Sequence, residues 1–158
     1  MRIAVGADHA GFAAKEEVKA WLQDWGHEVD DVGTHGPEPV DYPAYAVMVA
    51  RRVAAGEDDL GMLVCGSGIG VCIAANKVPG IRAAYATDTY SAKMARAHND
   101  ANVLCLGARV TGPELMKELV AGFLASSFEG GRHQRRVEQI TRIERGALEG
   151  VVEEEAGR

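Results

Sequence analysis

The heptapeptide VCGSGIG, residues 64–70, combines a cysteine, a serine and three alternating glycines. Cys65 ends an apolar run, and a segment with helical periodicity follows. The glycines let the backbone turn sharply and approach a ligand closely. Amide groups at the start of a helix favour an anion and can stabilise a thiolate. The pattern fits a site for a phosphate or for an oxyanion formed during reaction, and also a plain glycine turn with a buried cysteine.

The turn GADHAG, residues 6–11, presents Asp8 and His9, a carboxylate beside an imidazole. Its glycine spacing matches that of a phosphate-binding P-loop, but Phe12 and Ala13 stand where that motif has Lys and Ser or Thr. The G-x-G-x-x-G pattern is also absent. Nucleotide binding by either device is therefore unsupported. The alternative to a ligand site is a capping aspartate with a surface histidine.

Three further segments carry groups able to bind or transfer protons. His98 and Asn99 end a predicted helix, and Arg109 follows a predicted strand, so we expect these three near the same edge of the sheet. Arg132 and Arg136 are four residues apart and share one helix face, which suits a phosphate clamp. The charge pattern alone favours the alternative, a solvated basic face.

The elements that must position these groups follow from apolar patterning. Short apolar runs predict buried strands, with a weaker edge candidate at residues 27–33: RIAV, GMLVC, RAAYA and NVLCL. Segments with helical periodicity or capping signals lie between them, near residues 14–25, 45–52, 67–77, 88–98, from Thr111 onward, and 132–145. Thr111 is predicted to cap its helix, with Glu114 completing a capping box. This alternation predicts an α/β fold with an open parallel sheet, whose ligands bind at the carboxyl ends of the strands.

Composition narrows the class of protein. The 158 residues suit one domain, predicted over residues 1–147, with a disordered acidic tail at 148–158. The net charge of −6 argues against a general nucleic-acid binder. The apolar segment 60–75 is too short and glycine-rich to span a membrane, and no signal-peptide pattern opens the chain. Three cysteines without a C-x-x-C pair indicate neither a disulfide framework nor a zinc site, so we expect a cytoplasmic protein.

Taken together, these groups suit proton abstraction beside a carbonyl in a phosphorylated small molecule. A thiol base, an oxyanion-binding loop, an acid–base histidine and several arginines are what an aldose–ketose isomerase needs. We expect no metal and no cofactor.

Six segments resemble the type B ribose-5-phosphate isomerases, a family that also contains the galactose-6-phosphate isomerase subunits: GADHAG, DYP, CGSGIG, AANKVPGIRAA, AHNDANVLCLGAR and RHQRRV. The resemblance runs in order from Met1 to about Arg145. It implies a Rossmann-like three-layer α/β/α sandwich with a five-stranded parallel sheet. It also implies a homodimer or tetramer, in which the C-terminal helix serves dimerisation and each site is built from two subunits.

The resemblance also implies residue roles. Cys65 would move the proton between C1 and C2, assisted by Ser67, and His98 would help to open the sugar ring. Other residues would bind the sugar or its enediolate: Asp8, His9, Tyr42, Gly66, Gly68, Ile69, Gly70 and Asn99. The phosphate would be held by His9, Arg109, Arg132 and Arg136.

Two departures from the family pattern bear on the chemistry. Some members have threonine where Ser67 stands, which keeps the hydroxyl. Another branch lacks the cysteine and uses a glutamate at the position of Val71, which cannot take a proton, so Cys65 is the expected base here. The predicted function is isomerisation of ribose 5-phosphate and ribulose 5-phosphate in pentose phosphate metabolism. The alternatives are a hexose 6-phosphate such as allose or galactose, a tetrose phosphate, or a non-catalytic sugar-phosphate-binding module.

Overall fold

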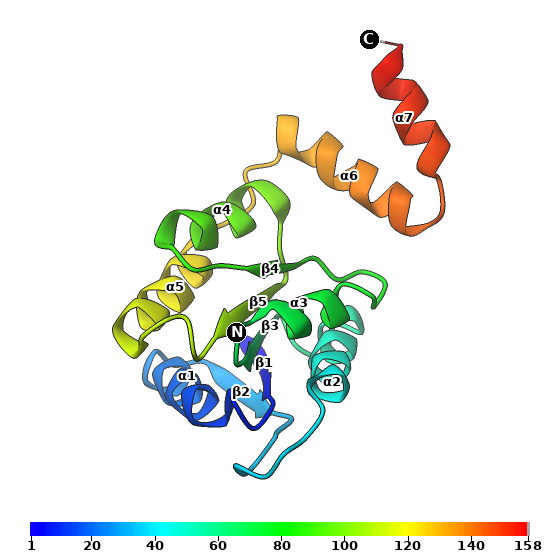
Figure 1. The fold of residues 1–158 in the computed structure, drawn as a ribbon. Coiled ribbons are helices and arrows are strands. Elements are labelled where there is room, and N and C mark those ends of the chain that lie inside the picture. The colour runs from blue at the N-terminus through cyan, green and yellow to red at the C-terminus, as the bar shows by residue number, and fades with distance from the viewer. Residues whose placement is uncertain (158) are drawn as a thin grey trace.

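In the computed structural model, which describes residues 1–157, the chain forms one five-stranded parallel sheet (Figure 1). The strand order is β2-β1-β3-β5-β4. The strands are β1 (Arg2–Ala7), β2 (Glu28–Asp31), β3 (Leu60–Cys65), β4 (Ala83–Tyr85) and β5 (Val103–Gly107). The predicted α/β class with five parallel strands is therefore confirmed.

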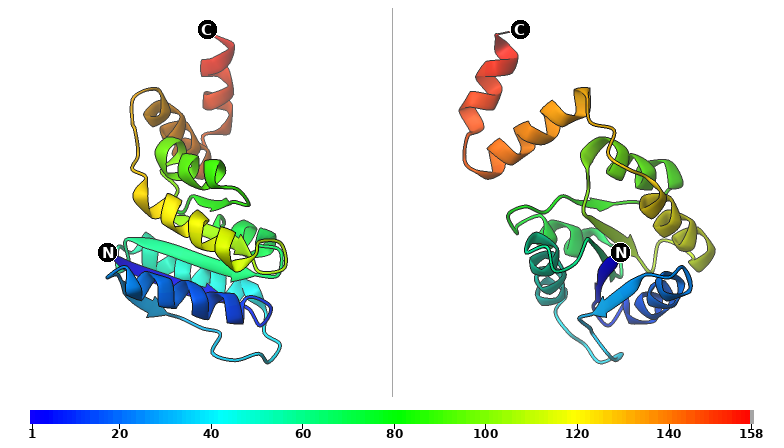
Figure 2. Two further views of the ribbon diagram at one scale, coloured as in Figure 1. Left: turned by 90° about the vertical axis from the view of Figure 1, so that its left-hand side faces the viewer. Right: turned by 180° about the vertical axis from the view of Figure 1, so that it is seen from behind.

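Helices cover both faces of the sheet, and the two views in Figure 2 show the layers. Helices α1, α4 and α5 contribute to the core on one face, and α2 and α3 to the core on the other. The helices that cover the sheet are α1 (Phe12–Asp24), α2 (Tyr42–Ala54), α3 (Ile69–Ala75), α4 (Thr89–Asn99) and α5 (Pro113–Ala125).

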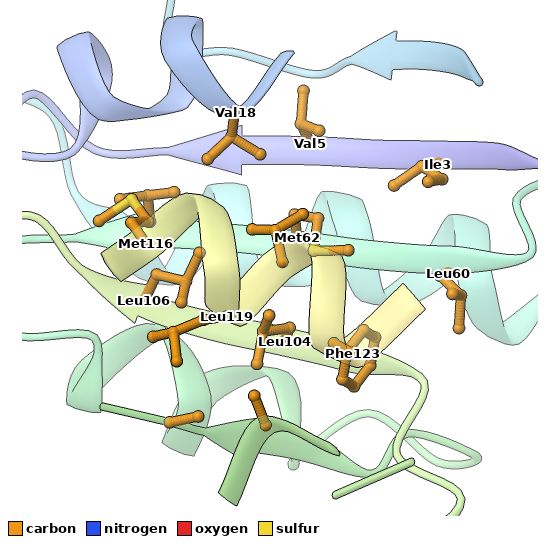
Figure 3. Close-up of a cluster of buried hydrophobic side chains, with 14 of the residues drawn as sticks. Ile3, Val5, Val18, Leu60, Met62, Leu104, Leu106, Met116, Leu119 and Phe123 are labelled. Carbon is orange, nitrogen blue, oxygen red and sulfur yellow. The ribbon is translucent and has the colours of Figure 1, made fainter. Parts of the chain in front are cut away.

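The central strands are the most apolar segments of the chain, and they are buried on both faces. Every residue of β3 and β5 is buried. Figure 3 shows the larger core, where Met116, Leu119 and Phe123 of α5 pack over Met62 and Leu104 of the sheet. Burying each such side chain contributes about 1.5–3 kcal/mol. This packing fixes the strand ends from which the loops of the site emerge.

The two outer strands of the sheet, β2 and β4, are less buried than the central strands. Strand β2 is only partly buried, in line with the weak pattern of residues 27–33. Its end is fixed by a buried charge, because the fully buried Nζ of Lys15 lies 2.6 Å from both carboxylate oxygens of Asp31. The sequence patterns did not reveal this pair.

Helix ends depart from the predictions at three points. Helix α3 is shorter than residues 67–77, because the backbone enters the helix only after Gly68, which has a φ of +81°. The cap of α5 is Gly112 and not Thr111. The hydroxyl of Thr111 is buried without a hydrogen-bond partner. The predicted capping box is therefore wrong, since the extended backbone of Gly112 supplies the turn before Pro113.

Two C-terminal helices extend beyond the sheet layers (Figures 1 and 2): α6 (Arg132–Glu144) and α7 (Leu148–Ala156). The region predicted as a loose tail is therefore helical up to Ala156, and Arg158 lies outside the described residues. Glu149 in the first turn of α7 favours the helix, and Arg142 of α6 pairs with Glu154 at 2.6 Å. Within residues 1–157, none of the helices combines the length and the apolar character needed to cross a membrane.

Candidate active site

The carboxyl ends of three neighbouring strands meet at one edge of the sheet. Ala7 of β1 pairs with Val64 of β3, and Cys65 of β3 pairs with Gly107 of β5. The loops after these strands therefore lie side by side around a cavity of about 650 Å³. The cavity is lined by Asp8, His9, Ala10, Tyr42, Cys65, Gly66, Ser67, Ile69, Gly70, Ile73, Arg109 and Val110. Gly68, which does not line it, lies within the same loop.

Cys65 occupies the base of this cavity, with 4% of its surface exposed. Its Sγ accepts a hydrogen bond from the backbone N–H of Gly68 at 3.1 Å. A Cβ on Gly68 would lie 2.6 Å from the ring of Tyr85, so the positive φ and the close packing both require glycine there. The thiol is thus held by the loop that the sequence singled out.

The remaining loop residues shape the cavity wall. The hydroxyl of Ser67 accepts the N–H of Ile69 at 3.3 Å. Gly70 lies against the ring of Tyr42, and a Cβ there would come within 2.6 Å of it. Because α3 has only seven residues and therefore a short helix dipole, an anion at this point would be held mainly by the amide groups of the loop and of the first helical turn.

Asp8 and His9 both line the cavity, and each also has a structural contact. Asp8 is buried, and its Oδ1 accepts the N–H of Gly11 at 2.9 Å within the turn before α1. Gly11 is the N-cap of α1 and no side chain caps this helix, so Asp8 is not the capping aspartate of the alternative prediction. The Nδ1 of His9 accepts the N–H of Val40 at 3.2 Å. A neutral imidazole that accepts at Nδ1 carries its proton on Nε2, where it can donate to an anion.

Arg109 completes this half of the site. Its backbone N–H donates to the carbonyl of Gly66 at 2.9 Å, which fixes the start of the β5 loop against the glycine loop. A Cβ on Gly66 would lie 3.3 Å from a guanidinium nitrogen of Arg109. The cavity therefore combines a thiol, loop amides, an imidazole and a guanidinium.

His98 and Asn99 lie at the opposite edge of the sheet, so the prediction that they lie near Arg109 is wrong for a single chain. The segment after α4 meets the amino end of β3, where the N–H of Gly61 donates to the carbonyl of Asn102 at 2.9 Å. The physical reason is direction: a helix that follows a strand in a parallel sheet runs back towards the amino edge.

A second cluster forms there between α4 and α6. The rings of His98 and His133 stack with centroids 4.0 Å apart and planes 8° from parallel. The carboxylate of Glu129 lies 3.8 Å from Nε2 of His98 and 3.9 Å from Nε2 of His133. Burial lowers the pKa of His133 below its usual 6.5, and the neighbouring His98 and Arg132 lower it further. These surroundings therefore favour the neutral form of His133.

The three ligand-type atoms of His98, Glu129 and His133 lie within 4.8 Å of one another. A metal ion lies in the plane of each imidazole that binds it. Two stacked rings with centroids 4.0 Å apart and planes 8° from parallel cannot both direct a lone pair at one ion, so this arrangement fits ring stacking and not metal ligation.

Arg132 and Arg136 are exposed on α6 and do not line the cavity. The Nε of Arg132 donates to Nε2 of His133 at 3.4 Å, which places this guanidinium beside the stacked histidines. The predicted site residues thus fall into two groups, one at each edge of the sheet.

Sequence reasoning missed several residues of both groups. Ala10, Ile73 and Val110 line the cavity but carry no chemical signal in the sequence. Glu129 and His133 contact His98 only in the folded chain, so no local pattern predicts them. The one signal in the sequence was that His133 directly follows Arg132, a predicted phosphate ligand.

Comparison with known proteins shows which family the chain belongs to. Residues 3–140 match the family model described as Ribose/Galactose Isomerase. The chain is 54% identical over 143 residues to ribose-5-phosphate isomerase B of Escherichia coli, covering 90% of this chain and 96% of the relative.

Two solved structures share the fold at high similarity. Ribose-5-phosphate isomerase B of Clostridium thermocellum superposes with a TM-score of 0.92 at 50% identity, covering 93% of this chain and 99% of the other. The Mycoplasma genitalium enzyme, solved with bound ribulose-5-phosphate, has a TM-score of 0.88 at 41% identity, covering 91% and 96%. The family model covers residues 3–140, and the relatives match over nine tenths of the chain. The chain therefore belongs to the ribose/galactose isomerase family of sugar phosphate isomerases.

Proposed function

We propose that this protein interconverts ribose 5-phosphate and ribulose 5-phosphate through an enediolate. The observation that carries the proposal is the Cys65 thiol at the base of a cavity that also holds His9 and Arg109. The cavity volume of about 650 Å³ accommodates a phosphorylated pentose. The Escherichia coli relative and the ribulose-5-phosphate bound to the Mycoplasma genitalium enzyme support the choice of a pentose phosphate.

In the proposed mechanism, the Cys65 thiolate removes the proton from C2 of the open-chain aldose. The negative charge that forms on the C1 oxygen is stabilised by amide groups of residues 66–70 and by the Ser67 hydroxyl. The same thiol then returns the proton to C1, and a proton moves between the two oxygens to give the ketose. The bond from Gly68 N–H to Sγ supports the thiolate during this exchange.

Ring opening requires a second acid–base group, and we assign it to His98, with Asp8 binding sugar hydroxyls or the ring oxygen and Asn99 contacting the sugar. Because His98 lies at the far edge of its own sheet, it would act on the cavity of a second copy. The homo-oligomer, a dimer or a tetramer, would then have composite sites. Ile140 and Ile143 on α6 are each more than 40% exposed and give this helix an apolar surface for such contact.

The phosphate would be bound from both sides of this interface. His9 and Arg109 are in the cavity, and Arg132 and Arg136 would come from the partner. Guanidinium groups bind phosphate oxygens through paired hydrogen bonds, which suits a dianion held away from the reacting carbons.

The direct test is isomerisation of ribose 5-phosphate by the wild type and by Cys65→Ala, with EDTA present. We expect turnover in the wild type and a loss of about 10²–10⁴-fold in the variant, with sugar-phosphate binding and thermal unfolding little changed. Full activity in Cys65→Ala would show that Cys65 is not the base. Binding of ribose 5-phosphate without turnover in the wild type would favour a sugar-phosphate-binding module, and a panel of hexose and tetrose phosphates tests the other substrates.

A further inference from the structure

The loop of residues 32–41, which joins β2 to α2, has no regular secondary structure, yet its first residues continue the sheet beyond β2. The N–H of Ala7 donates to the carbonyl of Gly33, and the N–H of Thr34 donates to the carbonyl of Ala7, both at 2.8 Å. Ala7 lies two residues before His9. The start of this loop and the turn that carries His9 are therefore fixed against each other.

A buried ion pair holds the same end of the loop. The Oδ1 of Asp31 accepts the N–H of Gly33 at 2.9 Å. The Nζ of Lys15, which is fully buried, lies 2.6 Å from both oxygens of this carboxylate, and the Nζ of Lys19 lies 2.9 Å from one of them. Breaking a buried ion pair is costly, so the pair keeps its geometry and holds the start of the loop with it.

The far end of the loop contacts the cavity. The N–H of Val40 donates to Nδ1 of His9 at 3.2 Å. Two residues further on, Tyr42 lines the cavity, and Gly70 of the glycine loop packs against its ring. The amide that binds the imidazole therefore belongs to a segment held at both of its ends.

This contact decides which way the imidazole of His9 is turned. A backbone N–H is always a donor, so the ring nitrogen that faces it must offer its lone pair. The proton of the neutral ring then lies on Nε2, and turning the ring over would replace Nδ1 by a C–H group and lose the bond. Within residues 1–157, Nε2 of His9 has no hydrogen-bond partner, so its proton is available to a ligand in the cavity.

We propose that the loop of residues 32–41 is the positioning element of His9, and that the N–H of Val40 orients the imidazole for the substrate phosphate before the substrate binds. This inference rests on the proposed function, in which His9 binds that phosphate. A ring that is already held loses less freedom when it binds, which favours the complex. Val40 is thus a positioning residue that acts through its backbone and not through its side chain.

The hydrogen bond has a direct spectroscopic signature. In the isotopically labelled wild type without ligand, at a mildly alkaline pH, we expect an NMR scalar coupling across the bond between the Val40 amide nitrogen and Nδ1 of His9. We also expect the ring proton on Nε2. The chain has five histidines, and His9→Gln assigns the signals of this one. A ring proton on Nδ1, or no coupling, would overturn the proposal.

A pair of variants separates the backbone of Val40 from its side chain. Val40→Pro removes the N–H, whereas Val40→Ala keeps it and shortens the side chain. We expect Val40→Pro to raise KM for ribose 5-phosphate about 10-fold with a much smaller effect on kcat, because the orienting hydrogen bond is lost. The increase in Val40→Ala should be far smaller. Equal increases in the two variants would assign the role to the side chain and contradict the proposal.

The same change in a His9→Ala background tests whether the effect passes through the imidazole. There, Val40→Pro should add less than about twofold to KM, because the N–H has no ring to orient. A 10-fold increase in both backgrounds would show a general disturbance of the loop, and the positioning role would be wrong.

The NMR measurement uses the wild type, so it does not depend on the folding of a variant or on turnover. Turnover of ribose 5-phosphate without the coupling would contradict the positioning role and leave the proposed function intact. The coupling in a wild type that does not turn over ribose 5-phosphate would contradict the proposed function and leave the orientation of His9 intact.

Discussion

The cavity at the carboxyl edge and the histidine cluster between α4 and α6 are held in different ways. The cavity is assembled by backbone: the register of β1, β3 and β5 and the turns after them fix Cys65, His9 and Arg109. The cluster is assembled by side chains, through the stacking of His98 on His133 beside Glu129. One chain carries both groups but holds them at opposite edges of its sheet. The two would complete one another only across a symmetric interface, where each copy presents both surfaces.

The largest expected effect separates the chemical tasks of the two regions. His98→Ala should lower turnover of ribose 5-phosphate, which is mainly a closed ring, by about 10²–10⁴-fold. Exchange of the C1 proton of ribulose 5-phosphate with solvent needs no ring opening and should continue, as measured by NMR in deuterium oxide. Cys65→Ala should lower both reactions about 10²–10⁴-fold. If the two variants lost proton exchange equally, His98 would not be confined to ring opening, and the separate roles of Cys65 and His98 would be contradicted.

The backbone of the cavity loop should be less tolerant of change than an ordinary turn. Gly68→Ala introduces a Cβ at a φ of +81°, 2.6 Å from the ring of Tyr85, and should lower the free energy of unfolding by about 2–4 kcal/mol. Gly26→Ala is the matched control, because its φ is +82° but no atom lies within 4 Å. The control should cost only about 1–2 kcal/mol in urea unfolding. Equal costs would show that the loop packing adds nothing.

On α6, the arginines should differ according to their position beside the cluster. Arg132→Ala should raise KM for ribose 5-phosphate about 10-fold with a smaller effect on kcat, because a charged hydrogen bond to phosphate contributes about 1.5–3 kcal/mol. Arg142→Ala, on the same helix and paired with Glu154 at 2.6 Å, should leave KM unchanged. Steady-state kinetics decide the matter, and equal KM values in both variants would contradict the phosphate clamp.

The smallest expected effect is the pH dependence of the cluster. The folded pKa of His133 lies below the usual 6.5, so the unfolded chain binds more protons as pH falls. The stability that neutral His133 provides is complete above about pH 6.5 and decreases as pH falls towards the folded pKa. Thermal unfolding of the wild type should therefore lose more stability between pH 7 and pH 5 than that of His133→Gln. Parallel curves would show that His133 is not held neutral.

Sequence patterns predicted the sheet and the cavity because both depend on local signals. Apolar runs specify buried strands, and glycines or polar residues at their ends mark the loops, so Cys65, Asp8 and Arg109 follow from position alone. The end of the sheet at which His98 lies depends on the direction in which α4 runs. The prediction from the sequence did not take this direction into account. Its partners, His133 and Glu129, depend on how α6 packs against α4, and no local pattern encodes that contact.

The central claim, that one site takes its base from one copy and its ring-opening histidine from another, has a direct measurement. Cys65→Ala and His98→Ala proteins, each nearly inactive, are mixed in equal amounts, unfolded and refolded together. In a dimer with composite sites, half of the pairs are mixed and each mixed pair has one intact site, so about a quarter of wild-type activity should return. If mixed pairs form but the mixture stays as inactive as its parents, Cys65 of one copy and His98 of the other do not form one site. That result would contradict the composite site.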